Sequence, residues 1–236
     1  MNSSFKWMGP WAGALLLTAE VASAQTFGSD DQFAVSAERL FGVVFASEST
    51  EDAGATQTVN LTTLSVLSSP MGSLTTSYSF PRVGADFVLG DGPSIGAALG
   101  LFTLSGSAEV EQGGVSAKQD TGSGTGFLLM PRVGLPVMFQ EHVGIWPRAG
   151  ISYIAVSSES GDGSLDTSSN RLALTLEVPL VLSPVPHTGF IVAPTLDVGL
   201  SGSNETSTDA TGAVSSAEQD VTGTEYGLQA GLFLYF

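Results

Sequence analysis

The feature that most constrains this chain is a regular alternation of apolar with polar or small residues. It is clearest at the C-terminal end, where every even position from Tyr226 to Phe236 is apolar and Gly227, Gln229 and Gly231 lie between them. A period of two residues is that of a β-strand, whose successive side chains point to opposite faces. Eight segments show it, two of them weakly (31–46 and 94–106), and the other six are 83–89, 133–139, 145–153, 172–180, 190–200 and 226–236. The sequence therefore predicts an all-β fold with eight strands.

The connections between these segments alternate between short and long. Asp91-Gly92-Pro93, 140–142 and 183–187 are short and contain turn-forming residues. The other connections, 47–77, 107–124, 157–170 and 201–221, are long and polar. Short turns at one end and long loops at the other are typical of bacterial outer-membrane barrels. We therefore predict an eight-stranded antiparallel transmembrane β-barrel, with short periplasmic turns, long extracellular loops and both ends of the mature chain in the periplasm.

The N-terminal segment has the three parts of a secretory signal peptide. Lys6 supplies the positive charge, residues 11–17 the short apolar stretch, and Ala22-Ser23-Ala24 the small-residue cleavage site. We predict that residues 1–24 are removed and that 25–236 form a single barrel domain. No run of about 18 apolar residues follows, so the sequence predicts no transmembrane helix.

The architecture resembles that of small outer-membrane β-barrels, similar to the eight-stranded transmembrane type of outer-membrane proteins A and X. The resemblance rests on the signal ending at Ala24, the strand-and-loop alternation and the aromatic end of the chain. It covers the mature chain but matches no specific subfamily. It implies that Leu232, Leu234 and Phe236 form the C-terminal signal read by the barrel-assembly machinery. The resemblance thus implies an outer-membrane location.

Charge and composition exclude several kinds of function. Lys+Arg 7 against Asp+Glu 23 gives a net charge of −16, which disfavours nucleic acid as a partner. The chain has no Cys, so disulfides, thiolate metal ligands and cysteine nucleophiles are absent, and it has only 2 His. We therefore expect no cofactor, no bound metal and no nucleic acid.

Several charged residues fall on the strand faces opposite the apolar ones. If the apolar faces contact lipid, these side chains point into the lumen. An eight-stranded barrel has room there only for side chains, so buried charges must pair. Two interpretations follow, a salt-bridged plug that closes the barrel or a narrow polar conduit. The predicted lumen residues are Glu38 (with Arg39 beside it leaving the first strand ambiguous), Arg82, Asp86, Arg132, Arg148, Glu177, Asp197 and Glu225.

The long loops hold most of the acidic residues against a single basic one, Lys118. They are either solvated, mobile loops or sites for divalent cations that bridge lipopolysaccharide; the stretch 161–166 lacks the ligand spacing of a calcium loop. The apolar segment Val59 to Leu67 is different, since a ninth spanning strand would reverse every later one. We predict that it is a loop segment folding over or into the barrel mouth, as a lid or as a partner-binding edge.

Four functions remain open. The one we favour is a non-catalytic outer-membrane barrel with a structural or surface-interaction role through its acidic loops. The others are a small channel or hydrophobic-solute transporter, a lipid-modifying enzyme, and a soluble secreted barrel. His142 and His187 fall in the predicted periplasmic turns, across the membrane from an outer-leaflet substrate, which disfavours the enzyme. The expected partners are outer-membrane lipid, lipopolysaccharide and the barrel-assembly machinery, and we expect a monomer.

Overall fold

The structure is a computed structural model that describes residues 26–28, 31–52, 55–66, 80–112, 115–161, 164–210 and 213–236. The predicted signal peptide lies outside these residues. In the described part of the chain, no helix is long and apolar enough to cross a membrane. The secondary structure there consists of β-strands joined into one sheet.

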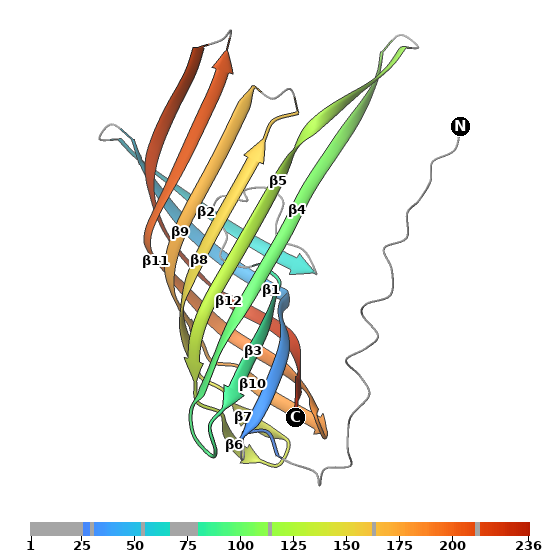
Figure 1. Cartoon of the computed structure of the whole chain (residues 1–236), viewed down its shortest axis with the longest axis vertical. Coiled ribbons are helices and arrows are strands. Elements are labelled where there is room, and N and C mark those ends of the chain that lie inside the picture. Colours follow the sequence, from blue (N-terminus) through green and yellow to red (C-terminus); the bar gives the residue numbers. More distant parts are fainter. Residues whose placement is uncertain are drawn as a thin grey trace.

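Eight antiparallel strands close into a ring, which confirms the predicted barrel. Each strand pairs with the next, and β12 closes the ring by pairing with β1. Figure 1 shows the inclined strands of this barrel, with the C-terminus at the end where β10 and β11 meet. In ring order the strands are β1 (Gln32–Asp52), β3 (Arg82–Val88), β4 (Ser94–Gln112), β5 (Val115–Gly134), β8 (Arg148–Glu159), β9 (Leu165–Glu177), β11 (Thr188–Ala210) and β12 (Ala213–Tyr235).

The apolar faces point outward, as the membrane interpretation requires. Burial alternates at every residue of β3, where Arg82 is buried and Val83 is 59% exposed. In the last strand Leu232 and Leu234 are exposed while Gln229 is buried. Large apolar side chains are exposed over most of the ring strands in this way. A protein in water would bury such faces, so this belt is the surface that contacts lipid.

The predicted long loops are mostly extensions of the strands. The β4–β5 ladder continues from Ser94 opposite Gly134 to Gln112 opposite Val115, and the β11–β12 ladder ends with Ala210 opposite Ala213. Both hairpins rise far above the barrel in Figure 1. Segments rich in Thr and Ser can form strands without an apolar face, because the two strands of each hairpin pair their backbone N–H and C=O groups with each other. The apolar alternation therefore marked the membrane-facing part of each strand and missed its polar continuation.

The prediction that Val59 to Leu67 is a loop segment folding over or into the barrel mouth was wrong. Residues 55–66 form strand β2 (Ala55–Val66), antiparallel to β1 from Phe41 opposite Val66 to Asp52 opposite Ala55. Leu67 lies outside the described residues. This strand is additional to the closed ring, so the direction of the later strands is unchanged. It pairs because β1 offers an unpaired edge above Glu38, where β3 has ended.

Three further short strands lie at the periplasmic end. They are β6 (Val137–Gln140), β7 (Val143–Ile145) and β10 (Leu180–Val185), which pair with one another and with β11. The sequence segments 133–139, 145–153 and 172–180 each continue across a break in the structure. Pro136, Pro147 and Pro179 lie at these breaks, since proline has no N–H to donate to a ladder.

Candidate functional site

The lumen is crossed by a layer of buried, paired charges. Arg132 on β5 donates from Nη1 to Glu38 Oε2 at 2.7 Å and from Nε to Asp86 Oδ1 at 2.9 Å. Its Nη2 also contacts the second oxygen of Asp86. All three side chains are almost completely buried. Gly84 makes room for this fork, because a Cβ there would lie 2.4 Å from Arg132 Nη2.

Two carboxylates join the arginines of different strands. Glu38 Oε1 accepts from Arg148 Nη1 at 2.6 Å, and Glu38 Oε2 accepts from Arg82 Nε at 2.8 Å. Glu177 Oε2 accepts from Arg148 Nη2 at 2.8 Å, and its Oε1 contacts Arg82. Each carboxylate thus binds several guanidinium groups, whose planar forks suit this geometry. The layer ties together β1, β3, β5, β8 and β9.

Arg39 belongs to the same layer, and parity alone did not place it there. Its Nη2 donates to Glu177 Oε1 at 2.9 Å and its Nη1 to Asp197 Oδ2 at 3.1 Å. Glu38 and Arg39 both point inward because the β1–β12 register shifts between Ala37 and Phe41, a β-bulge in which Arg39 has φ 56°. Two adjacent charged residues inside an alternating strand were the sequence signal for this bulge.

The remaining two predicted lumen residues extend the layer toward β12. Asp197 also accepts from Thr175 Oγ1 at 2.6 Å. Glu225 is buried directly opposite Asp197 in the β11–β12 ladder. The structure therefore places all eight predicted lumen residues inside the barrel and adds Arg39.

An aromatic layer fills the lumen at the periplasmic end. Phe27, from the segment before β1, lies with its ring 5.0 Å from Trp146 and 4.8 Å from Phe233 in edge-to-face geometry. Trp146 donates to Ser94 Oγ at 2.9 Å, and the guanidinium of Arg148 lies 4.8 Å from the centre of its ring. The aromatic and charged layers are therefore in direct contact.

A second apolar layer lies on the extracellular side of the charges. Its buried members are Phe80, Ala98, Leu128, Met130, Ile154, Val156 and Ala173. Phe80 stacks on Phe102 with ring centres 4.8 Å apart. Side chains thus fill the lumen in three successive layers, as expected for an eight-stranded barrel.

An ion pair spans the lumen next to this apolar layer. Arg171, opposite Ile154 in the β8–β9 ladder, contacts Glu48 of β1 with 2.5 Å between Nη1 and Oε2. Both side chains are largely buried. Glu48 was expected in a loop, but β1 continues past it. Arg171 lies one residue before the predicted segment 172–180 and was not among the predicted lumen residues.

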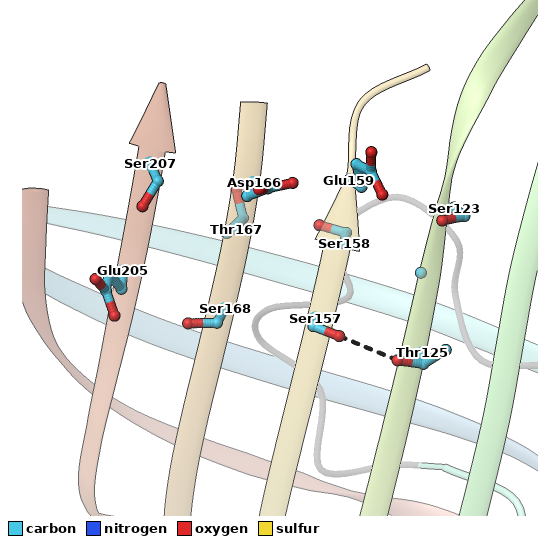
Figure 2. Close-up of a pocket in the computed structure, with 11 residues that line it drawn as sticks. Ser123, Thr125, Ser157, Ser158, Glu159, Asp166, Thr167, Ser168, Glu205 and Ser207 are labelled. Carbon is cyan, nitrogen blue, oxygen red and sulfur yellow. Dashed lines mark hydrogen bonds between the residues drawn. The ribbon is translucent and has the colours of Figure 1, made fainter. Parts of the chain in front are cut away.

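An outward-facing hollow lies on the wall of β5, β8, β9 and β11. Figure 2 shows its lining side chains, among them Thr125 and Ser157, whose hydroxyl oxygens are 3.0 Å apart. Its volume is about 270 Å³, and an adjoining hollow of about 500 Å³ shares Thr125, Ser157 and Ser168. We call the two together the outer groove. The sequence did not indicate it, because its residues come from five separate strands, β4, β5, β8, β9 and β11.

The two histidines lie in turns between short strands, apart from the charged layer and from the outer groove. His142 is exposed in the turn between β6 and β7, with Nε2 4.0 Å from Glu141. His187, at φ 64° in the turn between β10 and β11, holds its Nδ1 2.9 Å from the backbone oxygen of Tyr235. Within the described ranges, no group of three or more His, Asp and Glu side chains could hold a metal ion.

The C-terminal residues lie on the lipid-facing surface. Leu232, Leu234 and Phe236 are all exposed, and the backbone of Phe236 pairs with that of Phe33 across the closing seam of the barrel. Recognition of these residues by the barrel-assembly machinery stays a prediction.

Comparison with known proteins identifies the fold. No family model and no curated protein sequence matches the chain. Among solved structures, the outer membrane protein OprG from Pseudomonas aeruginosa is similar at 14% identity, covering 88% of this chain and 97% of that one with a TM-score of 0.54. The outer membrane protein AlkL matches at 12% identity and 0.46 over 100% of this chain and 97% of that one. The outer membrane protease OmpT from Escherichia coli matches at 8% and 0.42, over 91% and 99%.

At these identities the likeness shows the fold alone. The fold is that of a small bacterial outer-membrane β-barrel, and the exposed apolar belt makes the outer membrane its location.

Proposed function

We propose that this protein is a non-catalytic, non-conducting outer-membrane barrel that acts through its extracellular hairpins. The observation that supports this most is the filled lumen, in which an aromatic layer, a charged layer and an apolar layer follow one another. A path for water or ions would have to break several buried ion pairs at once. What remains accessible to a partner is the extracellular end, where exposed carboxylates include Glu159, Asp166, Glu205, Glu218 and Asp220.

The placement of the histidines supports a non-catalytic role. Both lie in turns at the end of the barrel that holds the C-terminus, away from the outer leaflet. Purified barrel carrying His142→Gln and His187→Gln should behave as the unmodified barrel does, with no hydrolysis or acyl transfer on lipid A. Turnover that disappears with either substitution would show that the protein is an enzyme.

Conductance in a planar lipid bilayer tests the closed lumen. The unmodified barrel should give no discrete current steps. A variant with Arg132→Ala and Arg148→Ala should give steps or fail to refold, because the carboxylates of the layer then lack their cations. Regular steps from the unmodified barrel at neutral pH would refute the closed-lumen proposal.

A second candidate, passage of small apolar molecules, is favoured by one further observation. β3 pairs with β4 only up to Leu99, so within the described residues Gly100–Gln112 of β4 have a partner strand only in β5. The stacked rings of Phe80 and Phe102 lie at this level, against the upper apolar layer. An apolar molecule that displaced Phe80 could therefore move sideways into the outer leaflet.

Dye uptake by whole cells separates the two candidates. If the barrel passes apolar molecules, N-phenylnaphthylamine should enter faster in cells that make it, and Ala173→Phe should remove the difference by filling the upper apolar layer. Equal uptake with and without the barrel would leave only the extracellular role.

A further inference from the structure

The outer groove has three tiers that follow the direction of the membrane normal. The lowest tier is apolar, with Leu101 78% exposed beside Phe127 in the β4–β5 ladder. The middle tier is a row of hydroxyls, Thr125, Ser157 and Ser168, which are consecutive partners across β5, β8 and β9. The upper tier is acidic, with Glu159 and Asp166, and a third carboxylate, Glu205, continues the hydroxyl row as the Cα partner of Ser168.

The groove is hollow because its middle is built from small residues. Ala155, Ser157 and Ser168 face outward between larger neighbours, and Gly126 lies beneath them. The Cα partners Phe127 and Ala155 place a large residue next to a small one, and at the next level both partners, Thr125 and Ser157, are small. The wall therefore recedes at the point where its surface changes from apolar to polar.

That change marks the level of the outer-leaflet headgroups. Below the hydroxyl row, Tyr153 is outward and exposed, and its hydroxyl donates to Asn170 Oδ1 at 3.1 Å. Tyrosine with an apolar ring and a satisfied polar end is typical of the membrane interface. A lipid beside this wall would thus have its chain against the lowest tier and its headgroup against the upper two.

We propose that the outer groove binds the sugar headgroup of an outer-leaflet glycolipid, with the start of an acyl chain against Leu101 and Phe127. This site lies on the barrel wall and shares Glu159, Asp166 and Glu205 with the carboxylates named for the extracellular role, but glycolipid binding does not depend on that role. The hydroxyls of Thr125, Ser157 and Ser168 both donate and accept, as sugar hydroxyls do. The carboxylates of the upper tier accept hydrogen bonds from sugar hydroxyls that the serines leave unpaired.

The charges of the groove define which part of the glycolipid is recognised. Its lining residues include carboxylates but neither Lys nor Arg. Glu159 and Asp166 are directly opposite each other in the β8–β9 ladder, so a phosphate placed between them would be repelled. The groove therefore takes the neutral sugar ring of a glycolipid and keeps its phosphates away from Glu159 and Asp166.

A matched pair of variants tests the site. The first carries Thr125→Leu and Ser157→Leu, which fill the hollow and remove the contact between the two hydroxyls. The control carries Ser49→Leu and Thr58→Leu, an exposed hydroxyl pair also 3.0 Å apart on β1 and β2, outside the groove. The substituted side chains of both variants face outward, so both barrels should stay folded. Slower migration on a gel after heating would verify that they are folded before heating.

Native mass spectrometry of the full barrel with added lipid A supplies the readout. We expect one retained lipid A per barrel, about tenfold weaker retention in the groove variant and no change in the control. Dodecyl maltoside should displace the lipid, whereas a polyoxyethylene detergent with the same dodecyl chain should not. Absence of retained lipid A in the unmodified barrel, equal losses in both variants, or equal displacement by both detergents would overturn the proposal.

Discussion

Replacing Arg132 by Met should strongly destabilise the barrel, because Arg132 is the main counter-charge of a buried carboxylate. Both oxygens of Asp86 accept from Arg132, and Asp86 has no other hydrogen-bond partner among the described residues. Glu38, by contrast, keeps Arg82, Arg148 and the hydroxyl of Ser36. The substitution therefore leaves one carboxylate, not two, buried without a cation.

The expected loss follows from that count. Removing one partner of a buried ion pair costs about 3–5 kcal/mol, since the remaining charge is left uncompensated. With a urea dependence of about 2 kcal/mol per molar, the midpoint of unfolding should fall by about 2 M. A second variant, Arg132→Met with Asp86→Leu, should recover most of the loss because it removes the uncompensated charge as well.

The measurement uses urea unfolding of the barrel in lipid vesicles, followed by the fluorescence of Trp146. This is the only tryptophan outside the predicted signal peptide, and it is fully buried in the aromatic layer beside Arg148. An unchanged midpoint for Arg132→Met would refute the reasoning and show that water reaches Asp86. Failure of the double variant to recover would show that the arginine acts through packing rather than charge.

Three further predictions concern other parts of the barrel. A membrane-soluble thiol reagent should label Leu232→Cys but not Gln229→Cys, since Leu232 is 45% exposed and Gln229 only 4%; the reverse would refute the facing of β12. Phe27→Ala should lower the free energy of unfolding by about 3–5 kcal/mol and shift Trp146 emission to longer wavelength, and neither change would occur if Phe27 did not pack there. Gly231→Ala should lower the free energy of unfolding by about 1–3 kcal/mol in the urea assay, because the new Cβ would lie 2.4 Å from Ala37 O, next to the bulge in β1. Gly223→Ala should lower it less, because the nearest atom to its Cβ is 3.2 Å away. Equal losses would contradict the close approach of β12 to the bulge.

The polar continuations of the strands show where sequence patterns lose their information. Residues 107–124 read as a loop because no face of them is apolar, yet Ser107 to Gln112 and Val115 to Asp120 form a regular ladder. Alternation reports which face meets lipid or lumen, and above the membrane both faces meet water. The pattern therefore ends at the membrane boundary even though the hydrogen bonds continue.

The sequence alone determined the number of ring strands, which face of each meets lipid and eight of the charges that lie in the lumen. These follow from a local period of two residues, so a single strand carries the information. Only the tertiary structure decided that Arg39 joins Glu177 and Asp197, that β2 pairs with β1, and that Thr125, Ser157 and Ser168 line one groove. Each of these depends on the register between strands distant in the chain, which is set by the bulge in β1 and by closure of the ring rather than by any one segment.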